Sequence, residues 1–246
     1  MARRARSMSE SGYMHIIVRG NGKQILFEEY QDYKHFLNRL ERYCLETEVK
    51  TCAYCLMDNH VHLLVHGEAS SIVLLMKKLE VSYSGYFNKK YERVGHLFQN
   101  RYLSERIETE KYLLTAFRYI LQNPEKAGIC KSSEFRWSSY SLYCNPPEYI
   151  DLSQIKLLLG DNEHYRRFIA YESDEECLDY NSNKHDDEWA KKELKNCLNI
   201  SSGTVLQNYS RIDRDAALSR LKDRGLSIRQ IERLTGINRN TIQRAK

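Results

Sequence analysis

Two histidines stand one residue apart in an otherwise apolar run, LMDNHVHLLV, at residues 56–65. Such a run is typical of a β-strand, in which side chains two residues apart point to the same face. His60 and His62 are therefore expected to project together, with Val61 on the opposite face. Two imidazoles at this spacing can share one divalent metal ion. Two ordinary packed histidines are the alternative, and the spacing alone does not decide between them.

A second pair of polar residues lies on a helix predicted for residues 109–123, which we expect to end before Pro124. Tyr119 and Asn123 are four residues apart and so share one helix face. A tyrosine hydroxyl can attack a metal-bound phosphate, and an amide can supply a further metal ligand. The chain has 18 tyrosines, and a tyrosine on a helix usually serves packing, so this pattern is weak by itself.

The elements that position these residues alternate along the first 130 residues or so. Apolar and β-branched runs predict strands at 13–20, 51–57, 60–65 and 95–107, and helical spacing of apolar residues predicts helices at 28–47, 70–90 and 109–123. The order β-α-β-β-α-β-α predicts an α+β fold, with helices on one side of an antiparallel sheet. Residues 131–150 are expected to be an ordered extension around Trp137.

The composition is that of a globular protein, with 41% hydrophobic and 29% charged residues. The sequence holds no apolar run long enough for a membrane span and no secretory signal, so we expect a cytoplasmic protein with no membrane partner. The net charge of +5 is compatible with a polyanionic partner. Cys52 and Cys55 form a CxxC without a second pair at zinc-ribbon spacing, and we expect reduced core thiols.

The composition changes toward the end of the chain. We predict a first domain at 1–150, a linker at 151–185, and a helical DNA-binding domain at 186–246. The last 36 residues, from Arg211, hold ten Lys and Arg against four Asp and Glu, a balance of 10 − 4 = +6. Glycines at 225 and 236 and capping residues at 227 and 238 predict a helix-turn-helix. Its last helix would read a major groove through Arg239, Asn240, Gln243 and Arg244. A plain helical bundle with a solvated basic face is the alternative.

Several motifs together resemble those of the REP-associated tyrosine transposases, which are single-tyrosine HUH transposases. The motifs are MDNHVHLLV, GHLFQNRYLS, YLLTAFRYILQNPEKAGI and WSSY, and the resemblance covers roughly residues 10–145. It implies a ferredoxin-like α+β fold, the HUH nuclease fold. It also implies that His60 and His62 bind Mg²⁺ or Mn²⁺, that Tyr119 is the nucleophile, and that Asn123 is the third metal ligand.

The same resemblance implies a metal-dependent endonuclease and strand transferase that cleaves single-stranded DNA through a 5′-phosphotyrosine, at hairpin-forming repeats. Such a protein would be associated with the nucleoid. Arg101 and Tyr102 in the second motif are expected to contact the DNA backbone and to stack on bases. Two other functions stay open: a non-catalytic repeat-binding regulator that uses the helix-turn-helix, and a zinc-dependent hydrolase that uses only the histidines. The sequence also leaves open whether the protein acts as a monomer or as a homodimer with shared active sites.

Overall fold

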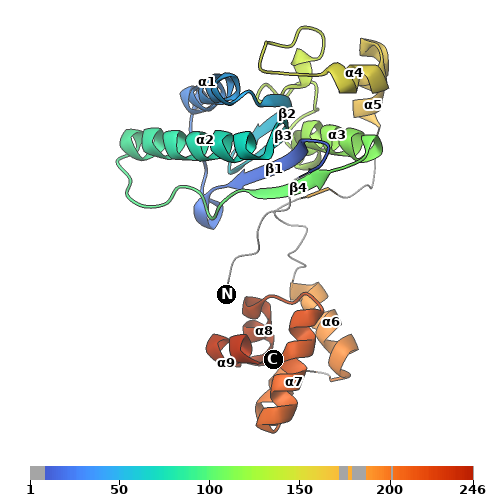
Figure 1. Cartoon of the computed structure of the whole chain (residues 1–246). Helices are drawn as coiled ribbons and strands as arrows, with labels where there is room; N and C mark the ends of the chain where they lie inside the picture. The colour runs from blue at the N-terminus through green and yellow to red at the C-terminus, as the bar shows by residue number, and fades with distance from the viewer. Residues whose placement is uncertain (1–8, 172–176, 179–186, 201, 246) are drawn as a thin grey trace. The chain divides into compact units, whose positions relative to one another are not determined.

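The computed structural model describes residues 9–171, 177–178, 187–200 and 202–245 (Figure 1). The chain divides into two compact units, residues 1–178 and 179–246. The first unit is therefore longer than the predicted domain at 1–150. Within it, residues 153–170 form helices α4 (Ser153–Leu159) and α5 (Asn162–Ala170) in place of the expected linker. Their apolar side chains join the core, and Ile155, Tyr165 and Ile169 are each 1% exposed. Of the predicted linker, residues 172–176 and 179–185 lie outside the described residues.

The first unit is built on a four-stranded antiparallel sheet. Its strands are β1 (Tyr13–Arg19), β2 (Lys50–Met57), β3 (His60–His66) and β4 (Leu103–Ile107), in the order β2-β3-β1-β4. With helices α1 (Tyr30–Thr47) and α2 (Ala69–Lys90), the chain order is β-α-β-β-α-β. This order and this sheet confirm the ferredoxin-like α+β fold. Short 3-10 turns occur at Asn21–Lys23 and Tyr140–Leu142.

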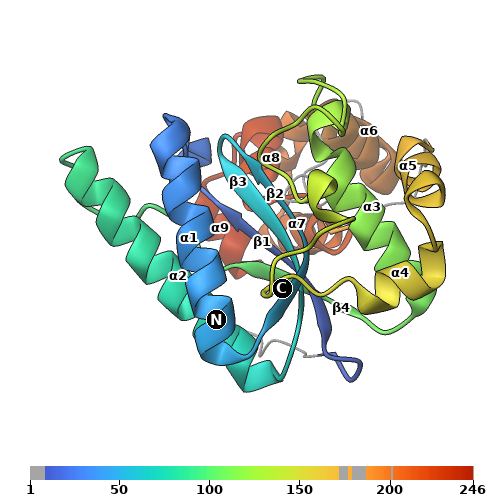
Figure 2. The same cartoon turned by 90° about the horizontal axis from the view of Figure 1, so that it is seen from above.

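Helices cover both faces of the sheet, whereas the sequence pattern predicted one covered face. Helices α1 and α2 pack together on one side, and α3 (Glu110–Lys126) packs against β2 and β3 on the other (Figure 2). The reason lies in β2 and β3, whose interior residues are buried whichever face they point to. A strand that is apolar on both faces must be covered on both.

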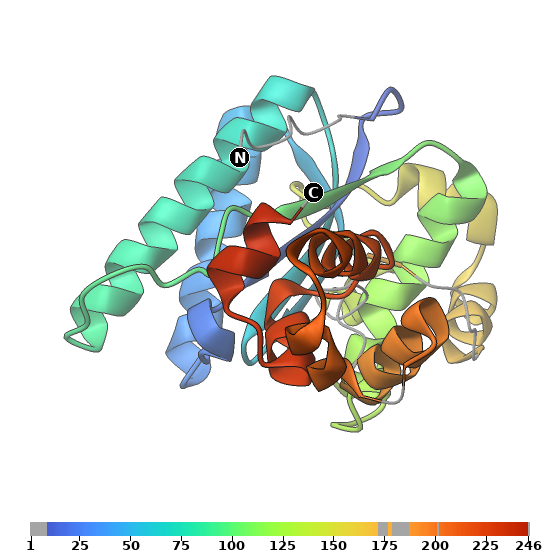
Figure 3. The same ribbon diagram turned by 90° about the horizontal axis from the view of Figure 1, so that it is seen from below.

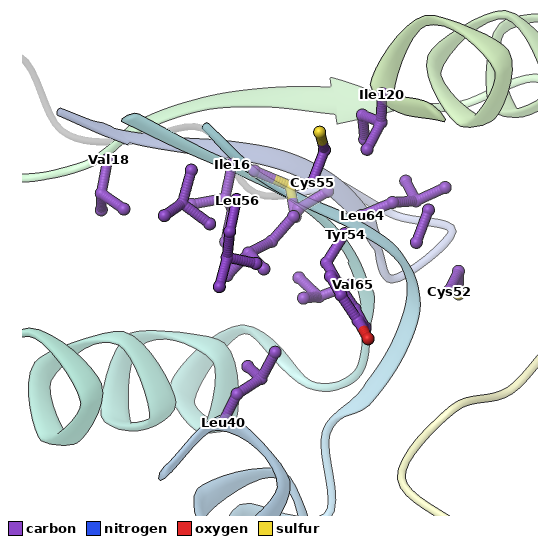
Figure 4. Close-up of a cluster of buried hydrophobic side chains, with 14 of the residues drawn as sticks. Ile16, Val18, Leu40, Cys52, Tyr54, Cys55, Leu56, Leu64, Val65 and Ile120 are labelled. Carbon is purple, nitrogen blue, oxygen red and sulfur yellow. The ribbon is translucent and has the colours of Figure 1, made fainter. Parts of the chain in front are cut away.

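Side chains of the central strands alternate between the two layers in Figure 4. Val18, Ile16 and Leu56 point toward Leu40 on α1, whereas Cys55 points to the opposite side, where Ile120 of α3 lies. All seven cysteines, each within the described residues, are free. Burial raises the pKa of the Cys52 and Cys55 thiols well above the usual range. The CxxC therefore consists of core thiols, as the sequence predicts.

Two predicted boundaries in the first unit are wrong. The strand expected at 95–107 forms only at 103–107, because residues 95–101 leave the sheet as a loop tied to the end of β1. In this loop the Gln99 amide donates to the Arg19 carbonyl at 2.9 Å. The helix α3 runs past Pro124 to Lys126, although proline removes one helical hydrogen bond. The turn after the proline closes nevertheless, since the Ala127 amide donates to the Asn123 carbonyl at 3.0 Å.

The second unit is all-helical in its described part (Figure 3). It contains α6 (Asp187–Leu198), a 3-10 turn (Gly203–Asn208), α7 (Arg211–Asp223), α8 (Ile228–Thr235) and α9 (Arg239–Arg244). The predicted caps form: Ser227 and Gln230 make a capping box, and Asn238 caps α9. Gly236 is left-handed, with φ +70°, and makes the turn between α8 and α9. Within the described residues, no helix is long and apolar enough to span a membrane.

Candidate active site

The histidine pair lies on the face of the sheet that α3 covers. His60 is half-buried and His62 is fully buried, with their ring centroids 5.0 Å apart. The neighbouring strand places Arg19 opposite His60 and Ile17 opposite His62. The Asn59 side-chain oxygen lies 2.7 Å from Nδ1 of His60. The prediction from the i, i+2 spacing is thus correct in its geometry.

A third histidine, which sequence reasoning missed, completes the cluster. His15 lies on β1 and is fully buried, and its Nε2 is 3.0 Å from Nδ1 of His62. The two strands pair side by side, with His15 opposite Leu64, so His15 and His62 are diagonal neighbours. The strand predicted at residues 13–20, YMHIIVRG, contains this histidine. Its spacing from the pair is 45 residues or more, so only the strand pairing brings the three together.

Burial controls the protonation of these imidazoles. It lowers the pKa of His15 to about 3, and burial together with His60 and His15 lowers the pKa of His62 well below its usual range. Both rings are therefore neutral near pH 7, which is the form that binds metal ions. Their mutual contact also constrains the tautomer. If Nδ1 of His62 donates to Nε2 of His15, Nε2 of His62 keeps a free lone pair for a metal ion.

The residues present fit a metal ion at one position. The Nε2 atom of His62 is buried and has no hydrogen-bond partner among the described residues. A buried polar atom of this kind costs free energy unless a partner satisfies it. Groups of three or more His, Cys, Asp or Glu suited to a metal ion are absent from the described part of the chain. A metal ion held by the two histidines would therefore take its other ligands from an amide, from water or from a substrate phosphate.

Tyr119 faces the histidines within the same chain. Its ring centroid lies 5.8 Å from that of His62 and 6.2 Å from that of His15, and both pairs meet edge to face. Tyr119 is half-buried, so the site keeps access to solvent. Helix α3 thus brings the predicted nucleophile to the predicted metal ligands without a second subunit.

Asn123 lies one helical turn beyond Tyr119, as predicted, and is half-buried. Its amide nitrogen donates to the carbonyl oxygen of Tyr119 at 2.8 Å, and Ile120 O lies at 3.5 Å. The second of these carbonyls is the one that Pro124 leaves without its usual helical donor. The side-chain nitrogen is thus held by the helix, and only the amide oxygen can serve as a metal ligand.

The continuation of α3 beyond Pro124 to Lys126 places a cation over the tyrosine. Lys126 lies seven residues after Tyr119 and therefore on the same helix face. Its Nζ is 4.5 Å from the centroid of the Tyr119 ring. A cation in this position favours negative charge on the phenol oxygen or on a phosphate attached to it. This lysine was not predicted, because we expected the helix to end before the proline.

The two residues of the GHLFQNRY motif behave differently. Arg101 is exposed and lines an open cavity of about 580 Å³ with Ser84, Gln99 and Asn100. This position suits contact with a nucleic-acid backbone. Tyr102, however, is 7% exposed and belongs to the core. The expectation that Tyr102 stacks on bases does not fit this burial, because a buried ring offers no face to a base.

The four residues predicted to read DNA in the second unit are all exposed on α9: Arg239, Asn240, Gln243 and Arg244. Ile242 on the same helix is fully buried and holds α9 against its unit. Arg239 forms an ion pair with Glu232 of α8. The other three are oriented away from the small core and are the stronger candidates for contact with DNA.

Comparisons with known proteins find one family model and two solved structures that are similar to part of this chain. Residues 8–123 match the family model of IS200-like transposases. A solved REP-associated tyrosine transposase, bound to a REP hairpin, is 16% identical, with a TM-score of 0.48 over 57% of this chain and 84% of that chain. A Deinococcus radiodurans R1 protein assigned as a transposase is 18% identical, with a TM-score of 0.34 over 48% and 95% of the two chains. No curated protein matches.

The family match covers both histidines, Tyr119 and Asn123, and lies within the first compact unit. This match to the IS200-like transposase model confirms the resemblance to transposases that the sequence motifs indicated.

The contact between His15 and His62 leads to a prediction. Replacing His15 with phenylalanine removes the partner of Nδ1 of His62, and we expect Mn²⁺ affinity to fall about 10- to 100-fold. His15→Gln keeps a hydrogen-bond acceptor at this position and should lose less Mn²⁺ affinity. Calorimetric titration with Mn²⁺ measures both, and thermal unfolding checks that both variants fold. Equal affinities in wild type and His15→Phe would show that His15 does not orient the ligand.

Proposed function

We propose that this protein is a metal-dependent endonuclease and strand transferase acting on single-stranded DNA, with Tyr119 as nucleophile. The observation that carries this proposal is the position of Tyr119 beside His62 and His15 on the buried face of the sheet, at 5.8 and 6.2 Å between ring centroids. The family supports a DNA-cleaving activity. The histidine pair, the tyrosine and a nearby cation supply the groups that such cleavage needs.

In this proposal His60 and Nε2 of His62 hold Mg²⁺ or Mn²⁺, with the amide oxygen of Asn123 as a further ligand. When bound, the metal ion polarises the scissile phosphate and stabilises charge on its oxygens. His15 fixes the His62 ring. Arg101 contacts the backbone of the strand outside the site, and Lys126 stabilises negative charge near the phenol oxygen.

The proposed covalent step needs no external energy source. The Tyr119 oxygen attacks phosphorus, a Tyr–O–P bond forms, and the bond from phosphorus to the 3′ oxygen breaks. The phenol proton is released and the 3′ oxygen takes up a proton, leaving a free 3′-OH and a 5′-phosphotyrosine. Attack by another 3′-OH reverses the step and joins DNA, because the phosphodiester energy is kept in the phosphotyrosine.

The substrate we propose is a strand beside a hairpin-forming repeat; the solved REP-associated tyrosine transposase is bound to a REP hairpin. A gel assay tests this with Mn²⁺ and hairpin oligonucleotides that carry single-stranded flanks, labelled at either end. The 3′-labelled fragment should migrate as a denaturant-resistant adduct, and the 5′-labelled fragment should be released. Release of both fragments without an adduct would exclude the phosphotyrosine reaction.

We further propose that the second unit binds duplex DNA through α9, which presents Asn240, Gln243 and Arg244 to solvent. Asn240→Ala should weaken binding to a preferred duplex about 5- to 100-fold, the usual range for one base-reading side chain. Arg244→Gln should weaken binding to all sequences and reduce its salt dependence. The control is Arg211→Gln, because Arg211 is an exposed arginine of the same unit, on α7. Equal losses in the control would indicate a general charge effect.

A further inference from the structure

An aromatic cavity of about 520 Å³ opens at the turn between β2 and β3, outside the histidine cluster. The residues that matter here are Tyr30, Tyr33, Asp58, Arg136 and Trp137, with Glu28 at the rim. None of these residues takes part in the proposed cleavage reaction. Aromatic rings with a few polar groups around them are the kind of lining that ligand sites have.

The wall of this cavity is a column of stacked rings. Tyr33 stacks on Phe27 with centroids 4.4 Å apart, and Trp137 stacks on Tyr33 at 4.3 Å and 9°. Tyr30 meets Trp137 edge to face and is 40% exposed. The buried end of the column is anchored in the core by Phe27. The outer end, at Trp137 and Tyr30, is where a further planar group can continue the stack.

Arg136 lies over the outer rings. Its guanidinium carbon is 4.7 Å from the centroid of Tyr30 and 5.4 Å from that of Trp137, and it donates to the Tyr30 hydroxyl at 3.2 Å. Arg136 is exposed. A guanidinium of this kind can stack on a planar ligand or contact its phosphate.

The rim adds hydrogen-bond acceptors. Asp58 accepts from the Tyr33 hydroxyl at 3.1 Å through one oxygen, and a carboxylate has about four lone-pair sites in all. Glu28 is exposed beside it. Carboxylates do not attract a phosphate, so the cavity suits the base of a nucleotide, and in particular an amino group on that base.

The cavity is tied directly to the candidate active site. Asp58 and His60 are two residues apart, at most about 7 Å of extended backbone. On the other side, the Leu56 amide donates to the Trp137 carbonyl at 2.9 Å, and Ser138 forms a bridge with Cys55, the strand partner of His62. A strand held at His60 therefore has only to pass the β2–β3 turn to reach these rings.

From these contacts we infer that the cavity binds one unpaired base of the DNA strand that flanks the scissile phosphate. The base stacks on Trp137 and meets the ring of Tyr30 edge to face, and its exocyclic amino group donates to Asp58. Cytosine, adenine and guanine carry such a group and thymine does not. The inference rests on the proposed function, because it takes the occupant to be the DNA strand that the histidine site cleaves.

Fluorescence offers a direct test, because the chain has only two tryptophans, Trp137 and Trp189. The full-length Trp189→Phe protein reports on Trp137 alone. We would titrate it with the octanucleotides dC8 and dT8, two pyrimidine strands that differ in the amino group. We expect dC8 to quench the fluorescence with a Kd about tenfold lower than that of dT8. A difference of about tenfold is the usual effect of one hydrogen bond to a charged group. Absence of quenching, or equal Kd values, would overturn the inference.

Two variants separate the contribution of the aromatic ring to base binding from that of the carboxylate. In the Trp189→Phe background, Tyr30→Ala should weaken the binding of both strands about tenfold, the usual effect of losing one aromatic ring that contacts a base. Asp58→Ala should weaken the binding of dC8 alone, so that the Kd values for dC8 and dT8 become equal. Tyr209→Ala is the control, because Tyr209 is 36% exposed and belongs to the second unit. Equal losses for Tyr30→Ala and Tyr209→Ala would also contradict a site in this cavity.

The same proteins separate this inference from the proposed cleavage. Trp137 quenching with the dC8 preference, in a protein that forms no adduct, would uphold the base site and reject the cleavage reaction. Adduct formation without Trp137 quenching would uphold the cleavage reaction and reject the base site. Tyr119→Phe should keep the quenching and its base preference, because Tyr119 lies on α3 and does not line the cavity.

Discussion

Tyr119→Phe is expected to abolish the covalent protein–DNA adduct and to reduce cleavage about 10³-fold or more, as the loss of a nucleophile does in other enzymes. The substitution removes one oxygen from a half-buried ring and leaves the ring packing against His62 and His15 in place. Mn²⁺ affinity and hairpin binding should therefore stay close to wild type. Gel assays with end-labelled hairpins and calorimetry measure these quantities.

Tyr112→Phe is the matched control, since Tyr112 lies seven residues earlier on the same helix. Its hydroxyl donates to Glu105 at 2.5 Å, and its loss should cost about 1 kcal/mol of stability while the adduct still forms. Cleavage that survives in Tyr119→Phe without an adduct would favour the hydrolase that uses only the histidines. Binding without cleavage in the wild type would favour a non-catalytic regulator.

His62→Ala is the second change with a large expected effect. His62 carries the buried Nε2 atom that we assign to the metal ion, so the variant should lose measurable Mn²⁺ binding. Cleavage should then fall about 10²- to 10³-fold, because a metal ion contributes several kcal/mol of charge stabilisation.

His66→Ala provides the comparison for His62→Ala. It lies on the same strand and face but stacks on Tyr13, with centroids 4.2 Å apart. This variant should keep both Mn²⁺ binding and the adduct. Unchanged Mn²⁺ affinity in His62→Ala, with a folded protein by circular dichroism, would rule out His62 as a ligand.

The sequence predicts the parts of the site that depend on local periodicity. His60 and His62 share a face because a strand repeats every two residues, and Tyr119 and Asn123 share one because a helix repeats every 3.6. The caps at Ser227 and Asn238 are likewise local, since each depends on residues within one turn. These features required no knowledge of tertiary structure.

Other features depend on contacts between distant segments and could not be predicted in this way. His15 reaches His62 only through the pairing of β1 with β3. The burial of Tyr102 depends on how the loop at 95–101 folds against β1. The position of Lys126 depends on a helix that continues past Pro124, against the local preference of proline.

The most direct test of the central claim is to map the covalent adduct by mass spectrometry. Trypsin releases residues 119–126 as YILQNPEK, in which Tyr119 is the single tyrosine. After reaction with a hairpin oligonucleotide and Mn²⁺, followed by nuclease and trypsin digestion, this peptide should carry a 5′-linked nucleotide on Tyr119. A nucleotide on another of the 18 tyrosines, or cleavage that leaves this peptide unmodified throughout, would contradict the account.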